Sequence, residues 1–135
     1  MDLMESLMIS AAGMRVQGER LRVVAENISN ADSVSEVPGG DPYRRKTISF
    51  RNALDRELGL ETVQVQKVGL DQSDFKIKYD PGNPAADAKG YVKLPNVNAL
   101  IEMTDMREAQ RSYEANLRAI EVARTMLQRT IDLIR

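Results

Sequence analysis

The chain has 135 residues, a formal net charge of −1 at pH 7, and neither cysteine nor histidine. The near-zero charge excludes a broad positive field for holding nucleic acid or an anionic membrane. The missing cysteine and histidine exclude disulfides, thiolate chemistry and most zinc sites. Hydrophobic residues make up 42% of the chain, enough for a buried core, but no apolar run reaches the roughly 18 residues of a membrane span. Asp2 and Glu5 stand where a cleaved secretory signal would carry basic residues, so we expect no such signal.

A helix is predicted over residues 2–31. Its apolar and small residues recur at steps of three and four, which predicts a heptad seam facing another helix. An ordinary amphipathic core helix remains an alternative on periodicity alone. Because glycine inside a helix costs about 1 kcal/mol relative to alanine, Gly13 and Gly18 predict that another backbone passes close by. The seam positions are Met4, Leu7, Ala11, Met14, Gly18, Leu21, Ala25 and Ile28.

The middle of the chain, residues 33–94, is predicted to form a small β-rich unit. The helix is expected to stop near Asn30, in a stretch rich in Asn, Ser and Asp whose side chains compete with helix for backbone hydrogen bonds. Residues 43–50 are expected to be extended, and 52–58 to form a short helical turn or a mobile loop. Alternating polar and apolar residues predict further strands at 62–68, 76–79 and 91–94. With few large apolar residues, this unit would be marginal alone.

The last forty residues, from about Pro95 to Arg135, carry the strongest pattern. No Pro or Gly interrupts them after Pro95, and either Asn96 or Asn98 can cap the helix that they predict. A seam repeating every seven residues must face a partner helix in a left-handed supercoil. Its positions are Ala99, Met106, Tyr113, Ile120, Leu127 and Ile134, widened by Met103, Ala109, Leu117, Ala123 and Ile131.

Together the two seams predict an α+β fold. Long N- and C-terminal helices form an antiparallel coiled-coil-like pair, and the small β-rich middle domain is inserted between them. The expected domain boundaries are 1–32 for the N-terminal helix, 33–94 for the middle domain and 95–135 for the C-terminal helix.

No residue pattern predicts catalysis, a metal or a cofactor. Four loop carboxylates could supply a general acid and base, but carboxylates on loops are more often solvated turn residues. The run Arg44-Arg45-Lys46 is the one dense positive spot, and protein salt bridges are favoured there over nucleic-acid contacts. We therefore expect no enzyme and no small-molecule substrate. The carboxylates are Asp71, Asp74, Asp80 and Asp87.

Several motifs resemble those of the bacterial flagellar axial proteins. Residues 27–33 (NISNADS) are similar to the signature that closes the first helix of that family, although Ile28-Ser29 replaces the usual Leu-Ala. Pro42-Tyr43-Arg44 is similar to a tyrosine-basic segment downstream. The segment 79–88, with 90–92 and 95–97, resembles one proximal rod protein more than its siblings, and residues 102–103 and 111–116 resemble the pattern before the final helix. The residues that carry the resemblance include Asn27, Asn30, Ala31, Asp32, Tyr43, Arg44, Asn96, Glu102, Met103, Tyr113 and Asn116.

The resemblance implies a subunit of the helical rod, the drive shaft that crosses the periplasm from the motor's membrane ring toward the hook. It implies other copies of the chain, sibling rod proteins and the rod junction protein at the membrane ring as partners. It also implies export by the flagellar type III apparatus. The predicted assembly interface comprises Leu7, Ala11, Met14, Gly18, Leu21, Ala25, Ile28, Met106, Tyr113, Leu117, Ile120, Leu127, Ile131 and Ile134.

Two other functions stay open. A coiled-coil binding module, such as an export adaptor or chaperone, would explain both helices and predicts a stable closed oligomer in solution. An enzyme would require the carboxylates of residues 71–87 to converge in a cleft.

Overall fold

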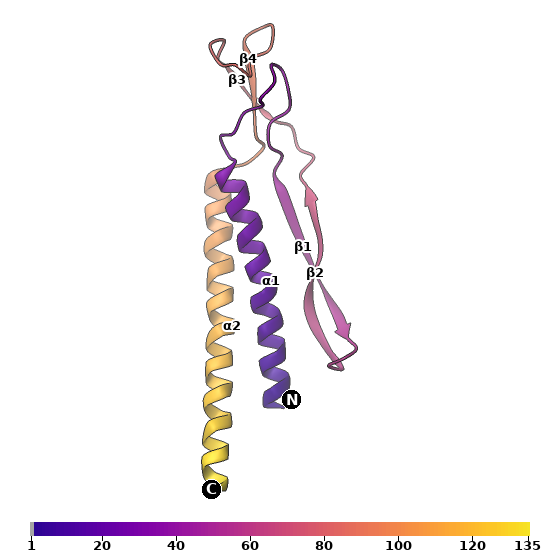
Figure 1. The fold of residues 1–135 in the computed structure, drawn as a ribbon, viewed down its shortest axis with the longest axis vertical. Coiled ribbons are helices and arrows are strands. Elements are labelled where there is room, and N and C mark those ends of the chain that lie inside the picture. The colour runs from indigo at the N-terminus through magenta and orange to yellow at the C-terminus, as the bar shows by residue number, and fades with distance from the viewer. Residues whose placement is uncertain (1) are drawn as a thin grey trace. The chain divides into compact units, whose positions relative to one another are not determined.

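The structure is a computed structural model that describes residues 2–135. Helix α1 (Leu3–Ser29) comes first and helix α2 (Ala99–Ile134) last (Figure 1). Between them the described chain forms the strands β1 (Lys46–Asp55), β2 (Leu60–Leu70), β3 (Lys76–Tyr79) and β4 (Tyr91–Leu94). Strands β1 and β2 pair with each other, and β3 pairs antiparallel with β4. The predicted α+β class, with a β region inserted between terminal helices, is confirmed.

The chain divides into two compact units, and each takes segments from both helices. Unit 1 comprises the chain up to Leu21, Ile48–Lys67 and Arg107–Arg135, and unit 2 comprises Arg22–Thr47 and Val68–Met106. The division into domains at 1–32, 33–94 and 95–135 stays a prediction. Neither helix of the described chain combines the length and the apolar character that crossing a bilayer requires.

The hairpin of β1 and β2 corrects the expectation for residues 52–58. Strand β1 continues to Asp55, so only residues 56–59 form the turn. The Asp55 carboxylate accepts hydrogen bonds from the backbone N–H groups of Glu57 and Leu58, at 3.0 and 3.3 Å. Gly59 adopts a φ of 66° and donates its N–H to the Asp55 carbonyl oxygen at 2.8 Å. This aspartate-closed turn is tight, and its glycine takes a conformation that other residues rarely adopt.

In unit 1 the segments of α1 and α2 lie side by side and antiparallel (Figure 1). Arg20 Nη2 lies 3.5 Å from Glu108 Oε2. A Cβ atom added at Gly13 would lie 2.8 Å from Asn116 Nδ2. Helix α2 therefore does approach Gly13, but the nearest atoms belong to a side chain and not to the predicted backbone. At Gly18 no atom of the described residues outside its own helix backbone lies within 4 Å of an added Cβ. The expectation of a backbone close to Gly18 is therefore wrong within this chain.

The face of α1 that meets α2 lies one residue away from the predicted seam. Gly13 and Arg20 in unit 1, and Asn27 in unit 2, contact α2 at steps of seven. The predicted seam runs through their neighbours, such as Met14 and Leu21, so it is rotated by about 100° around the helix. Apart from Val24, the contacting face carries small or polar residues and gives only a weak apolar signal, which is why periodicity selected the adjacent stripe. Other positions on this contacting face are Ser6, Ser10, Gln17 and Val24.

The predicted seam of α2 lies on its buried side. Ala109 and Ala123 are buried, and the large members of the heptad from Met106 to Leu127 are half-buried. The seam opens toward the end of the helix, where Ile134 is 81% exposed. Asn98, not Asn96, caps α2: its Oδ1 accepts hydrogen bonds from the backbone N–H groups of Leu100 and Ile101 at 3.1 and 3.5 Å. The exposed seam positions are Met103, Leu117, Ile131 and Ile134.

Candidate functional site

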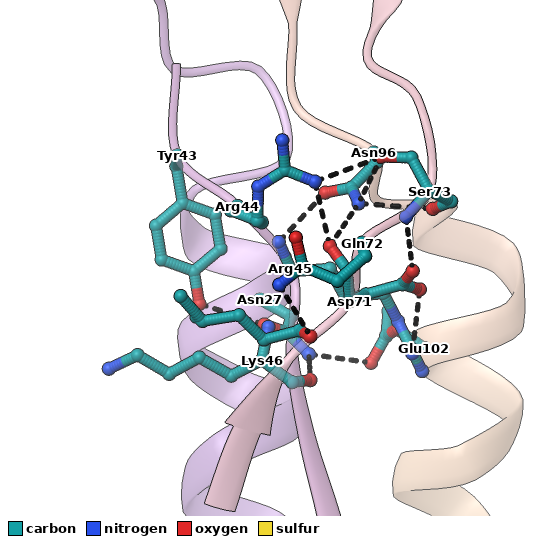
Figure 2. A network of polar contacts seen from close by, with 11 residues as sticks. Asn27, Tyr43, Arg44, Arg45, Lys46, Asp71, Gln72, Ser73, Asn96 and Glu102 are labelled. Atoms are coloured by element: carbon teal, nitrogen blue, oxygen red, sulfur yellow. Dashed lines mark hydrogen bonds and ion pairs between the residues drawn. The ribbon is translucent and has the colours of Figure 1, made fainter. Parts of the chain in front are cut away.

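A dense network of polar side chains lies in unit 2 (Figure 2). Its members come from the end of α1, the start of β1 and the segment before it, the segment after β2, and the start of α2 and the segment before it. Although they are far apart in the sequence, the network unites five of the residues that carry the flagellar resemblance. We call it the polar junction, and it consists of Asn27, Tyr43, Arg44, Arg45, Lys46, Asp71, Ser73, Asn96 and Glu102.

Asn27 is the hub of the polar junction. It is only 1% exposed. Its Nδ2 donates to the Lys46 carbonyl oxygen at 2.9 Å and to Glu102 Oε2 at 3.2 Å. Its Oδ1 accepts from the Lys46 N–H at 2.9 Å and from the Tyr43 hydroxyl at 2.8 Å. All four hydrogen-bonding positions of the amide are thereby used, so no other side chain of this size fits the same contacts.

Glu102 brings a buried charge into the polar junction. It is also 1% exposed, and an unpaired carboxylate at such a place would be very costly. Arg45 Nε donates to Glu102 Oε1, and Arg45 Nη1 lies 3.5 Å from Asp71 Oδ2. Burial by itself lowers the pKa of Arg45, but the hydrogen bond and the charge of Glu102, helped by Asp71, raise it overall. The guanidinium thus links α2 to the segment that follows β2.

Asn96 and Arg44 hold the segment after β2 from two sides. Asn96 Oδ1 accepts from the Arg45 N–H at 2.8 Å, and its Nδ2 donates to the carbonyl oxygens of Asp71 and Ser73 at 3.1 and 3.2 Å. Arg44 Nη1 donates to the same two carbonyls at 2.8 and 3.0 Å, while its guanidinium lies 4.2 Å above the Phe75 ring. Hydrogen bonds from Ser73, with the charge of Arg45, lower the pKa of Asp71.

Lys46, from the basic run, and Tyr43 are the remaining members of the polar junction. Lys46 Nζ lies 2.6 Å from Glu26 Oε1, so with Arg45 the prediction of protein salt bridges for this run is confirmed. Burial, together with the charges of Glu26 and Glu102, raises the pKa of Tyr43 to about 12. Its hydroxyl is therefore held in the neutral form that donates to Asn27.

Three of the four loop carboxylates singled out from the sequence accept hydrogen bonds within turns. Asp71 belongs to the polar junction. Asp87 accepts the backbone N–H groups of Tyr91 and Lys89 at 3.0 and 2.9 Å, and these bonds lower its pKa. Asp80 Oδ2 accepts from Asn83 Nδ2 at 3.5 Å. Within residues 2–135 no three or more acidic side chains are grouped so as to hold a metal ion.

The other residues of the resemblance lie outside the junction. Asn30 Nδ2 donates to the Glu26 carbonyl oxygen at 2.9 Å and so helps to end α1, while Ala31 and Asp32 form the following turn. In α2, Met103 is exposed and Tyr113 half-buried, and Asn116 lies against Gly13. Sequence reasoning missed Ser73 and the junction role of Asp71, because nothing in a loop of this composition marks a contact with residues so distant in the chain.

The chain is similar to known flagellar proteins. The family described as flagellar basal body rod FlgEFG protein C-terminal matches residues 88–133, and relatives that span nearly the whole chain make it a flagellar rod protein. The flagellar basal-body rod protein FlgC of Agrobacterium fabrum is 57% identical over 127 residues, which cover 94% of this chain and 91% of the relative. The FlgC proteins of Escherichia coli and Aquifex aeolicus are each 40% identical over 133 residues. These residues cover 98% of this chain in both cases, and 98% and 97% of the relatives.

With such identity over nearly its whole length, the chain belongs to the family of the flagellar basal-body rod protein FlgC. The resemblance inferred from its motifs is confirmed.

Proposed function

We propose that the protein is a structural subunit of the flagellar proximal rod, the drive shaft that passes motor torque to the distal rod and hook. Membership of the FlgC family supports this. Its partners are then other copies of itself, sibling rod proteins and the rod junction protein at the motor's membrane ring. It reaches the periplasmic rod through the flagellar type III export apparatus. It transforms no substrate, and it binds neither a cofactor nor nucleic acid.

The observation that carries the proposal is the position of the predicted seam on α1. Because α2 contacts the adjacent face, this apolar seam is left partly open: Met4 is 47% exposed, and Ala11 and Ala25 are exposed. The large seam residues are only half-buried, and a Cβ atom added at Gly18 would have no other part of the described chain within 4 Å, its own turn of helix aside. An apolar stripe with heptad spacing is suited to a second helix, so we assign it to a helix of a neighbouring rod subunit.

The shape of this seam suits close helix packing. Large side chains at Leu7, Met14 and Leu21 alternate with small ones at Ala11, Gly18 and Ala25, so a neighbouring helix can interlock with them at native density. A contact between two different surfaces of successive subunits does not close on itself and builds a helical assembly. The open seam positions of α2, from Leu117 to Ile134, offer a second surface of the same kind.

The test replaces Gly18. Gly18→Leu should prevent rod formation, because the leucine fills the space reserved for the neighbouring helix. Gly18→Ala is the matched control: it removes the same helix-weakening glycine, adds only one methyl group and should leave rod formation intact. Both variants should raise the stability of the isolated chain, by about 1 kcal/mol for alanine. Each variant is expressed in a strain that lacks its own copy of the gene for this protein. Rod formation is measured in basal bodies isolated from that strain, and motility is measured in the same strain.

Normal rods with Gly18→Leu would overturn the assignment of this seam. The coiled-coil adaptor remains the second candidate. A stable closed oligomer of the pure protein, unchanged on dilution, would favour the adaptor over an open-ended rod subunit.

A further inference from the structure

The pairing face between α1 and α2 in unit 1 does little to define its own register. On α1 it carries Ser6, Ser10, Gly13 and Gln17, and on α2 the small buried residues Ala109 and Ala123 flank Asn116 at heptad steps. Sliding one helix by seven residues would again place most of these small residues opposite small residues, and it would separate Arg20 from Glu108, whose side chain is 70% exposed. Register is strongly specified only where a shift exposes apolar groups or leaves buried polar groups unpaired.

The polar junction in unit 2 supplies such a penalty. Asn27 and Glu102, both 1% exposed, are hydrogen-bonded across the two helices. Gly13 lies two heptads before Asn27 on α1, and Asn116 lies two heptads after Glu102 on α2. The contact between Gly13 and Asn116 and the contact between Asn27 and Glu102 therefore correspond to the same register of the two antiparallel helices. A slip by one heptad would take Glu102 away from Asn27 and leave two buried polar groups without these partners.

We propose that the polar junction sets the register in which α1 pairs with α2, with Glu102, Asn27 and Arg45 as the determining residues. This control of helix register acts within a single chain, and it goes beyond the proposed role in the rod. Each helix is continuous from the junction into unit 1, so fixing one turn fixes the pairing of the turns that follow.

The proposal depends on the difference between what a buried polar group adds to the free energy of folding and how strongly it selects one helix register. A buried ion pair often contributes little net stability, because desolvation offsets the attraction, and apolar residues of similar volume can replace it. A single buried polar residue can nevertheless select one helix register, because other registers leave it unpaired. Replacing both Arg45 and Glu102 by apolar residues should therefore leave the chain helical but relax its register.

The experiment uses disulfide competition, for which the absence of native cysteine gives a clean background. One full-length chain carries Ser6→Cys, Gly13→Cys and Asn116→Cys, so the thiols introduced at positions 6 and 13 compete for the thiol at position 116 in a glutathione buffer. The two competing positions are about 10.5 Å apart along the helix, beyond disulfide reach of each other. A second chain carries Arg20→Cys in place of Ser6→Cys and monitors a slip in the opposite direction. Mass spectrometry of proteolytic fragments gives the ratio of the two disulfides.

With the junction intact, the disulfide between positions 13 and 116 should exceed the slipped disulfide at least tenfold in both chains. Adding Arg45→Met with Glu102→Leu should lower this ratio at least threefold in one of them, while circular dichroism shows unchanged helix. The matched control, Lys93→Met with Asp41→Leu, removes an exposed ion pair of unit 2 and should leave both ratios unchanged.

Unchanged ratios in both chains carrying Arg45→Met and Glu102→Leu would overturn the proposal. Loss of helix in that variant would overturn it too, because the junction would then be a source of stability and not of register. Equal relaxation in the control would show that removal of any ion pair has this effect, which also contradicts it.

Discussion

The two units join the same pair of helices by different physical means. In unit 2 the helix ends are held by a buried polar network in which both Asn27 and Glu102 are 1% exposed and hydrogen-bonded. In unit 1 the pairing face is small and polar, and one of its amides, Gln17 Oε1, is buried without a hydrogen-bond partner among the described residues. Much of the exposed apolar surface of α1 and α2, including Met4, Leu117 and Ile134, also belongs to this unit.

This difference separates helix ends whose buried polar groups are satisfied within the chain from helix segments whose apolar stripes have no partner among the described residues. Buried polar groups that are fully satisfied make a rigid local structure. A helix whose apolar stripe has no partner is only marginally stable in water. On the proposed function, unit 1 gains its missing contacts from neighbouring rod subunits, whereas unit 2 arrives already formed.

The largest effect is expected from breaking the polar junction on one side only. Arg45→Met leaves the Glu102 carboxylate buried with only the Asn27 amide as partner, which should lower the free energy of unfolding by about 3 kcal/mol. Urea denaturation measures this loss. The control Lys93→Met breaks an ion pair whose side chains are 43% and 68% exposed and should cost less than about 0.5 kcal/mol. If both variants lost a similar amount of unfolding free energy, the polar junction would contribute no more to stability than an exposed ion pair does, which would contradict the account.

A smaller effect concerns pH. Because the pKa of Tyr43 is raised from 10.0 to about 12, its contribution to stability is fully present below pH 10 and is lost as the pH rises through 12. The absorbance of tyrosinate, measured as the difference between the wild type and Tyr43→Phe, should show a transition with its midpoint near pH 12. A midpoint near pH 10 would mean that Tyr43 is not enclosed by the junction.

The sequence predicted those parts of the molecule that carry a periodic apolar signal or a local turn signal. The helices, the strands at 62–68, 76–79 and 91–94, and the seam of α2 through Ala109 and Ala123 follow from such patterns. The contacting face of α1 could not be predicted, because Ser10 and Gly13 give no apolar signal and the more apolar stripe beside them serves another surface.

The polar junction was predictable only in part. Family resemblance marked Asn27, Tyr43 and Glu102, but nothing local indicated that Asp71 and Ser73 would meet them. These contacts depend on the path of the chain between β2 and α2, which brings backbone carbonyls to Asn96. Long-range pairing of this kind leaves no mark in spacing or composition.

The most direct test of the central claim is amide hydrogen exchange on the dilute full-length protein. We expect residues 23–29 and 102–106, in the helix segments of unit 2, to exchange at least tenfold more slowly than residues 5–13 and 120–130 in unit 1. Equal or stronger protection at the outer segments would contradict the account, because unit 1 would then be complete without any neighbouring subunit.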